Sequence, residues 1–394
     1  MQAISQPPTD SDFVQNPYPF YDRARALGDL VYWTDYDLPV ATSFAAVNAI
    51  LKDRRMGREA PPGFHPEIPT KHAPFYAVEA HSMLEAEPPR HTRLRGSVLR
   101  AFTGRRINIL QPEIQELTNR LIDVFAPGGC DLLDAFARPI PVIVIARFLG
   151  IPETMTDDLL RWSNAMVGMY QAGRTAADEN LAIAATNDFG AFLRDFIAMR
   201  QKAPQDELIS HLIAISNDKD AEEPTLSPDE VISTVILLLN AGHEATVHSL
   251  GNAVKTLLET NHRITRDNAL AVTEETMRFD PPLHMFTRWV YQDIEIFGQN
   301  FRPGDRIGCL LGSANRDPQI FGNPHLFDPT RKMVPNAAFG AGIHFCLGAP
   351  LARLELRTAL PILFQRLPDL ALKCPARYAD IYHFHGLRQL DVTY

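Results

Sequence analysis

The chain has 394 residues, of which 45% are hydrophobic and 22% are charged, and this composition is typical of an ordered globular protein. Its formal net charge of −9 argues against general binding to nucleic acid, and its four cysteines lack the spacing of a disulfide or zinc framework. The N-terminal segment is not built like a signal peptide, and no apolar run is long enough to cross a bilayer. We therefore expect a cytoplasmic protein without a membrane or nucleic-acid partner. Because no linker, charge block or repeat marks a boundary, residues 1–394 are predicted to form a single domain.

Helices dominate the predicted elements, and strands are few and short. In chain order, the hydrophobic patterns predict strands at 30–34 and 38–41, helices at 107–125, 140–149, 156–172, 177–201, 228–258 and 268–279, strands at 287–297 and 306–311, a helix at 347–360 that Pro361 ends or bends, and a strand near 387–394. The sequence therefore predicts a mainly α fold with a small β region.

A basic stretch runs against the acidic average of the chain. Residues 90–106 (RHTRLRGSVLRAFTGRR) contain six arginines and no acid. One interpretation is a solvated helix face, and the other is a site for an anionic cofactor or an acidic partner protein.

The predicted helix at 228–258 carries polar residues at its centre. A Ser-Pro-Asp-Glu capping box at 227–230 predicts its start, and about 30 residues of helix reach roughly 45–50 Å, which is enough to cross a domain. Its middle reads NAGHEAT, residues 240–246, where Gly242 weakens the helix and Glu244 needs a partner or water if it is buried. A kinked helix with a carboxylate facing an arginine and an active-site segment both fit this pattern.

A glycine-rich loop holds one cysteine directly before a predicted helix, in AFGAGIHFCLGAPLARLELR at 338–357. Glycines allow positive φ and close approach of a bulky group, and the helix N-terminus favours a thiolate at Cys346. This pattern leaves three roles open for Cys346: an inert core residue, a nucleophile, or a single thiolate ligand to a metal.

The segment FGAGIHFCLG, residues 339–348, resembles the haem-binding loop of the cytochrome P450 family, F-G-x-G-x-H-x-C-x-G, at every fixed position. Further matches follow along nearly the whole chain: the E-x-x-R pair Glu275 and Arg278, the H-x-x-x-R pair His91 and Arg95, Arg288 after Pro-Pro, and the A-G-x-E segment 241–244. The resemblance is to the soluble, bacterial type of this family, and it implies the cytochrome P450 fold with the long helix crossing the haem.

The resemblance also implies the roles of individual residues around haem b. Cys346 is expected to be the thiolate ligand of the iron. The propionates, which need cations or hydrogen-bond donors, are expected to contact four residues: His91, Arg95, Arg288 and His344. Close approach of the haem is expected at Phe339, Gly340, Gly342, Gly348, Ala241 and Gly242. The E-x-x-R pair is expected to be structural, but its usual third partner is replaced by Leu326, and His325 is a candidate substitute.

The catalytic segment departs from the family pattern in one position. The acid Glu244 is expected to relay protons, and the family usually places a threonine directly after it. Here Ala245 occupies that position and Thr246 follows, so the hydroxyl is rotated by about 100° around the helix. We expect an ordered water or a hydroxyl of the substrate to replace the missing group.

The resemblance implies a monooxygenase that inserts one atom of O₂ into a small or medium apolar organic molecule. Since the chain has no flavin or iron–sulfur motif, electrons are expected from a separate ferredoxin with its reductase, or from a flavodoxin. A peroxide-using haem-thiolate enzyme and a non-catalytic haem sensor are the alternatives. Substrate contacts, for which core packing is an equal alternative, are expected from residues that include two polar anchors, Asn240 and His284: Phe75 and Tyr76 in a loop, Met166, Met169, Tyr170, Leu237, Asn240, Leu283, His284, Met285, Phe286 and Phe384.

Overall fold

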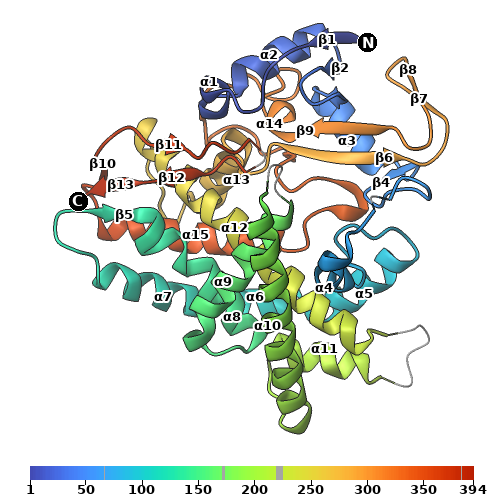
Figure 1. Cartoon of the computed structure of the whole chain (residues 1–394). Helices are drawn as coiled ribbons and strands as arrows, with labels where there is room; N and C mark the ends of the chain where they lie inside the picture. Colours follow the sequence, from blue (N-terminus) through green and yellow to red (C-terminus); the bar gives the residue numbers. More distant parts are fainter. Residues whose placement is uncertain (66, 171–173, 219–224, 383) are drawn as a thin grey trace. The chain divides into compact units, whose positions relative to one another are not determined.

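A computed structural model describes residues 1–65, 67–170, 174–218, 225–382 and 384–394 (Figure 1). Internal contacts divide the chain into two compact units, and both are assembled from separated segments. Unit 1 contains residues 1–64, 114–138 and 245–394, and unit 2 contains residues 65–113 and 139–244. Two helices, α7 (Gln111–Asp123) and α12 (Pro228–Glu259), run from one unit into the other along the chain. The predicted single domain over 1–394 stays a prediction.

Within the described residues of unit 1, a six-stranded sheet joins the N-terminal segment to a distant C-terminal one. Its strand order is β1 (Gln2–Ile4), β2 (Leu30–Trp33), β3 (Leu38–Ala41), β9 (Arg306–Leu310), β6 (Met285–Val290) and β4 (Met56–Gly57). β3 and β9 pair in parallel with Val40 opposite Gly308, and β9 and β6 pair antiparallel with Ile307 opposite Arg288. Buried residues of this sheet and of α3 (Phe44–Lys52) form one apolar cluster, so the sheet is fixed by side chains from far apart in the sequence.

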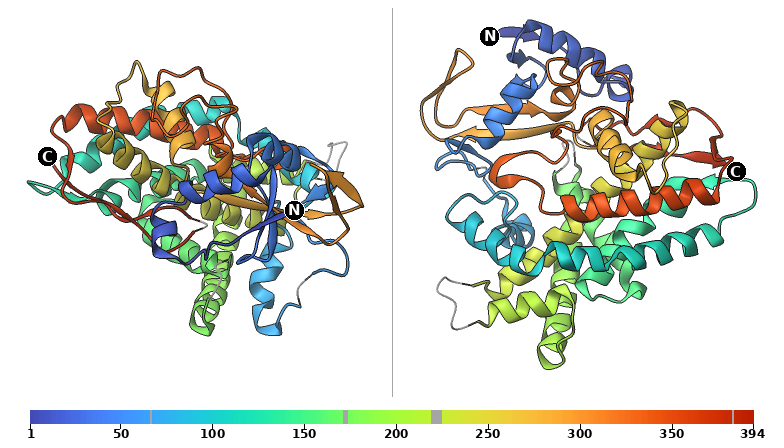
Figure 2. Two further views of the ribbon diagram at one scale, coloured as in Figure 1. Left: turned by 90° about the horizontal axis from the view of Figure 1, so that it is seen from above. Right: turned by 180° about the vertical axis from the view of Figure 1, so that it is seen from behind.

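A second cluster in unit 1 is aromatic and packs α1 (Ser11–Gln15) and α2 (Tyr18–Leu27) against β2 and β3. Trp33 is fully buried there, its indole N–H donating to the Gln6 carbonyl at 2.7 Å. The other elements of unit 1 are α13 (Ala269–Phe279), α14 (Leu311–Ala314), α15 (Ala349–Arg366), the π-helix η2 (Leu133–Ala137), the 3₁₀ turn η5 (Gly342–His344), β5 (Cys130–Asp131), β7 (Ile294–Ile296), β8 (Gln299–Phe301), β10 (Ala371–Leu372), β11 (Arg377–Tyr378), β12 (Leu387–Gln389) and β13 (Asp391–Thr393). Helix α15 is drawn in orange-red in both views of Figure 2.

Unit 2 is helical. Its elements are the 3₁₀ turn η1 (Thr70–His72), α4 (Ala73–Glu79), α5 (Arg90–Ala101), α6 (Gly104–Ile109), α8 (Pro139–Leu149), the 3₁₀ turn η3 (Glu153–Met155), α9 (Thr156–Val167), the 3₁₀ turn η4 (Gly168–Tyr170), α10 (Ala176–Lys202) and α11 (Leu208–Ser216). The predicted capping box of α12 is confirmed, because the Ser227 N–H donates to Glu230 at 2.8 Å and the Glu230 N–H donates to Ser227 Oγ at 3.2 Å. No helix in the described ranges combines the length and the apolar character that crossing a membrane requires.

The predicted elements are found with shifted ends, and some details differ. The predicted helix at 107–125 is two helices, α6 and α7, and the predicted strand at 287–297 is interrupted between β6 and β7. The helix at 156–172 ends as α9 and η4, with residues 171 and 172 of the prediction outside the described residues. Of the two predicted effects of Pro361, the end of the helix is wrong, since α15 continues to Arg366, and the bend stays a prediction. The neighbouring Leu360 and Leu363 are both 0% exposed, and their packing holds the turn despite the missing N–H.

Candidate functional site

The Cys346 loop of unit 1 is shaped by two glycines with positive φ, Gly340 at 69° and Gly342 at 73°. A Cβ on Gly342 would lie 2.3 Å from the Leu51 carbonyl oxygen, and one on Gly340 would lie 3.1 Å from the Phe286 ring. A side chain at 342 would require the backbone to shift, and one at 340 would require the Phe286 ring to move and would be strained by the positive φ. The loop therefore packs closely on the end of α3 and on β6, as its glycine content predicts.

Cys346 is presented at the start of α15. Its N–H donates to the Phe339 carbonyl at 3.0 Å, its residue is exposed, and α15 begins three residues later at Ala349. The positive end of a helix stabilises a nearby thiolate. Cys309 is the opposite case, because burial raises the pKa of its thiol to about 12. The geometry at Cys346 therefore suits a thiolate that reaches out to bind a ligand.

Arg288 lies on the strand that supports this loop. It is 3% exposed on β6, and its Nη1 donates to the Thr287 carbonyl at 2.8 Å. Since residues i and i+2 of a strand point to the same face, Arg288 shares a face with Phe286, which touches Gly340 of the loop. His344 belongs to the loop itself, in η5. Unit 1 thus carries a thiol and a histidine on this loop and an arginine on the supporting strand, and this set suits a large anionic cofactor.

The basic stretch of the sequence is α5 and α6 in unit 2. His91 is 3% exposed, and Arg95 lies one helical turn further along α5, so both are on one side of the helix. Arg93 points elsewhere, and its Nη1 binds Glu230 at 2.9 Å. Arg93 is therefore part of an ion pair within the unit, and the interpretation of the basic stretch as a site for an acidic partner protein stays a prediction.

The middle of α12 is open on one side. Ala241 is exposed although most of the helix residues before it are buried, and a Cβ on Gly242 would come no closer than 3.8 Å to Ile145. Protein packing in unit 2 therefore does not require a glycine at 242. His243 is 3% exposed, with Nδ1 3.4 Å from Ser163 Oγ, so it faces the core. The exposed Ala241 and the small Gly242 fit the close approach of a flat ligand.

The segment after this opening holds the predicted catalytic residues. Burial raises the pKa of Glu244, which favours its protonated form compared with a solvated carboxyl. Ala245 is partly buried, and its carbonyl accepts a hydrogen bond from Ser249 Oγ at 2.7 Å. Thr246 is 5% exposed. A carboxyl whose pKa lies closer to neutral is well suited to carrying a proton.

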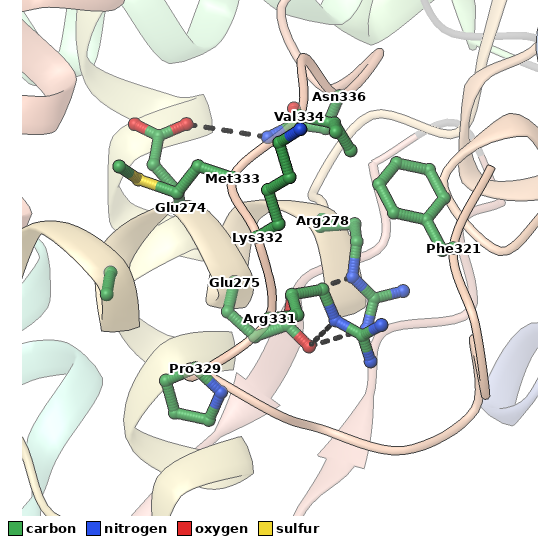
Figure 3. Close-up of a pocket in the computed structure, with 11 residues that line it drawn as sticks. Glu274, Glu275, Arg278, Phe321, Pro329, Arg331, Lys332, Met333, Val334 and Asn336 are labelled. Atoms are coloured by element: carbon green, nitrogen blue, oxygen red, sulfur yellow. Dashed lines mark hydrogen bonds and ion pairs between the residues drawn. The ribbon is translucent and has the colours of Figure 1, made fainter.

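Glu275 and Arg278 form a buried ion pair on α13, as their spacing predicts (Figure 3). Arg278 Nε and Nη2 each donate to a different Glu275 oxygen at 2.7 Å, and the residues are 4% and 2% exposed. The third partner is Arg331, whose Nε lies 3.2 Å from Glu275 Oε1. The suggestion of His325 is wrong, since its Nε2 lies 3.2 Å from Asp22 Oδ2.

The predicted substrate contacts divide between the two units. Phe75 and Tyr76 are on α4 and not in a loop, and the ring of Phe75 contacts that of Tyr170 at 5.9 Å. The remaining unit 2 candidates are Met166, Met169, Leu237 and Asn240, of which both methionines are buried. In unit 1, Leu283 and Phe384 form a β-bridge that is followed by Met285 and Phe286 on β6.

His284 lies in the protein core, because it is 0% exposed and surrounded by the rings of Tyr18, Tyr21, Tyr382 and His385. Its role as a polar anchor for the substrate stays a prediction. The sequence reasoning missed Glu79 of α4. Burial raises its pKa to about 7 beside Tyr170, and the sequence gives no signal for this because the effect comes from tertiary packing.

Comparison with known proteins gives consistent matches. The family described as Cytochrome P450 matches residues 269–368. The "Biotin biosynthesis cytochrome P450" of Bacillus subtilis (strain 168) is 35% identical and covers 100% of both chains. The "6-deoxyerythronolide B hydroxylase" of Saccharopolyspora erythraea is 35% identical over 85% of this chain and 84% of its own length.

Solved structures show the same relationship. A structure of P450BioI, in complex with an acyl carrier protein ligated to hexadec-9Z-enoic acid, superposes with a TM-score of 0.90 at 35% identity. The superposition covers 98% of this chain and 100% of the P450BioI chain. The structure of CalO2 also gives a TM-score of 0.90, at 29% identity over 99% of this chain and 98% of its own.

Proposed function

Because the chain belongs to the cytochrome P450 family, and is therefore a monooxygenase that binds haem b through a cysteine thiolate, we propose that Cys346 is the ligand of the haem iron. One observation carries this assignment. Cys346 is exposed at the start of α15, in a loop that two positive-φ glycines press against α3 and β6. The other cysteines lack this setting, and Cys309 is fully buried within the sheet.

Four cationic or hydrogen-bonding side chains are proposed to hold the propionates: Arg288 and His344 from unit 1, and His91 and Arg95 from unit 2. A buried carboxylate needs such partners, and a guanidinium can bind it through two parallel hydrogen bonds. Six residues around Cys346 and at 241–242, all small apart from one phenylalanine, are proposed to contact the ring closely: Phe339, Gly340, Gly342, Gly348, Ala241 and Gly242.

When bound, the haem-thiolate centre supplies the activation of O₂ that oxygenation requires. The protein must deliver protons and keep solvent from the reacting centre. Glu244 is proposed to carry the protons, because it is a partly buried carboxyl with a raised pKa on the open turn of α12. Electrons are proposed to come from a separate ferredoxin and reductase, or from a flavodoxin, and the protein is proposed to act inside the cell as a single domain.

The proposed substrate is a small or medium apolar organic molecule, in keeping with the apolar character of Phe75, Met166, Leu283 and Phe384. Two relatives indicate which classes of compound to test as substrates. P450BioI has been solved with a fatty acyl chain on a carrier protein, and another relative is a 6-deoxyerythronolide B hydroxylase. Spin-state shifts of the haem should therefore be screened with fatty acids, the same acids on an acyl carrier protein, and macrolactones.

The monooxygenase assignment is tested by product formation in two parallel reactions. With a substrate found by spin shift, NADPH, ferredoxin and reductase should give oxygenated product, and hydrogen peroxide alone should give much less. If peroxide alone supports equal or faster turnover, the enzyme is the peroxide-using alternative. If neither reaction gives product from a substrate that shifts the spin state, the sensor alternative is favoured.

Ala245 is expected to make the coupling of NADPH use to product depend on the substrate. Ala245→Thr should raise coupling about 2- to 10-fold for substrates without a hydroxyl, since one hydrogen bond contributes about 0.5–1.5 kcal/mol. Thr246→Ala should leave coupling unchanged, because Thr246 lies about 100° around the helix from position 245. The measurement compares NADPH consumed, product formed and peroxide released. Loss of coupling in Thr246→Ala, with no gain in Ala245→Thr, would show that the alignment of this segment with the family motif is shifted by one residue.

A further inference from the structure

Three potential metal ligands meet in the core of unit 1, outside the proposed haem site. They are Asp280 after α13, His284 before β6 and His385 near β12, and they are 5%, 0% and 2% exposed. One ligand atom from each lies within 4.8 Å of the others, and His385 Nε2 is 3.4 Å from Asp280 Oδ1. Among the described residues, this is a group of nitrogen and carboxylate donors from two segments of the chain, residues 280–284 and His385.

The lone pair of His284 is available inside this cluster. Its Nδ1 lies 2.7 Å from the hydroxyl of Tyr21, which itself donates to Tyr382 Oη at 2.9 Å. Because the hydroxyl proton of Tyr21 is used in its bond to Tyr382, the Tyr21 oxygen can only accept a hydrogen bond from His284. Nδ1 therefore carries the proton, and Nε2 is left with a lone pair and no hydrogen-bond partner in the described chain. A buried, unprotonated and unpartnered nitrogen is the form in which histidine binds a metal.

Asp280 is held as a carboxylate at the other side of the cluster. Tyr18 donates to its Oδ1 at 2.8 Å, and Tyr378 donates to its Oδ2. The ring of Tyr378 also stacks on that of His385 at 3.7 Å, which fixes the imidazole. Hydrogen-bonded supports of this kind orient metal ligands in proteins.

We propose that Asp280, His284 and His385 bind a divalent zinc ion. Two imidazole nitrogens and one carboxylate oxygen are a ligand set that zinc accepts, with a further position left for water. Zinc bonds of about 2.0–2.1 Å in a tetrahedron separate neighbouring ligands by about 3.3 Å. The 3.4 Å between His385 Nε2 and Asp280 Oδ1 already matches that edge, and a ligand atom of His284 lies within 4.8 Å of both.

The ion would connect two segments that carry proposed substrate contacts. Leu283 and Phe384 form a β-bridge, and each directly precedes one of the histidine ligands. The His385 N–H also donates to the Pro282 carbonyl at 2.8 Å. Zinc would therefore stabilise the folded chain and hold this bridge in place, without contacting the haem or its ligands.

The experiment uses the purified holoenzyme and reads zinc separately from haem iron by plasma mass spectrometry. After growth with added zinc and removal of loosely bound metal by gel filtration, zinc is expected in amounts equal to haem iron. A chelator should remove it and lower the midpoint of thermal unfolding, and zinc chloride should restore both, because a ligand that binds only the folded state stabilises it. This comparison needs no variant, so it holds even if substitutions in the core impair folding.

Variants then assign the ligands. His284→Gln and His385→Gln should lose zinc and the zinc-dependent shift of the unfolding midpoint, whereas His262→Gln, at a partly buried histidine hydrogen-bonded to Thr260, should keep both. Absence of zinc from the wild-type enzyme, together with no shift on its addition, would overturn the proposal and leave an Asp280–His385 ion pair. Retention of zinc in both cluster variants would also overturn it. Because no readout is turnover, this result is independent of the proposed monooxygenase activity.

Discussion

Replacing Cys346 by serine is expected to abolish the absorption band that a thiolate-ligated haem gives when it is reduced and bound to carbon monoxide. Serine keeps the size of the side chain but does not supply a thiolate, so NADPH-driven turnover should fall to background. Since Cys346 is exposed, the change leaves no cavity, and the free energy of unfolding of the haem-free chain should change by no more than about 0.5 kcal/mol. Difference spectra and chemical unfolding measure the two effects.

The chain offers a matched control at another exposed cysteine. Cys374→Ser makes the same substitution away from the loop and should keep the band and the activity. Arg288→Ala should give a third pattern, with less haem bound per chain but a normal band from the haem that remains. If Cys346→Ser keeps the band, or if Cys374→Ser loses it, the assignment of the ligand is wrong.

Replacing Glu275 by glutamine is expected to give the largest loss of stability of the variants considered, about 3–5 kcal/mol. Glu275 accepts hydrogen bonds from Arg278 and Arg331 and from the N–H of Asp328 in a buried position. A neutral amide leaves two guanidinium groups without their charge partner, and one of them is 2% exposed. The midpoint of urea unfolding and the haem content after purification should both fall.

The adjacent Glu274 provides the control for this prediction. It pairs with Arg353, with Nη2 3.0 Å from Oε2, but both side chains keep more than a fifth of their surface exposed. Exposed pairs of this kind contribute about 0–1 kcal/mol, so Glu274→Gln should hardly move the midpoint. Equal losses from Glu274→Gln and Glu275→Gln would show that burial of the Glu275 pair does not determine its contribution.

The sequence predicts those parts of the fold whose cause is local. The capping box at Ser227 and Glu230 marks the start of α12, and the spacing of Glu275 and Arg278 predicts their pairing on one helix face. Where tertiary packing determines the local structure, the prediction of secondary structure from the sequence fails. Helix α15 passes Pro361 because buried leucines on both sides hold it, and residues 73–79 form a helix that the sequence pattern does not reveal.

In the candidate site, too, features with a local cause can be predicted from the sequence and features that depend on tertiary packing cannot. The loop around Cys346 can be predicted because its glycines and the following helix are consecutive in the sequence. Arg331 could not be found as the third partner of Glu275, since the loop between them determines which arginine reaches the carboxylate. The Asp280, His284 and His385 cluster is equally hidden, because its last member is distant in the sequence and only the folded chain places it beside the others.

The sheet of unit 1 has a consequence for the order in which the molecule is made. Val40 of β3 pairs with Gly308 of β9, which is about 270 residues later in the chain. At a synthesis rate of about 5–20 residues per second, the N-terminal strands leave the ribosome roughly 13–54 s before their partners exist. During that interval the edge of β3, which carries the apolar Val40, lacks its partner strand β9, although β2 already pairs with β1 and β3. We expect the nascent N-terminal segment to depend on a chaperone until β9 emerges, and slower translation to lengthen that dependence.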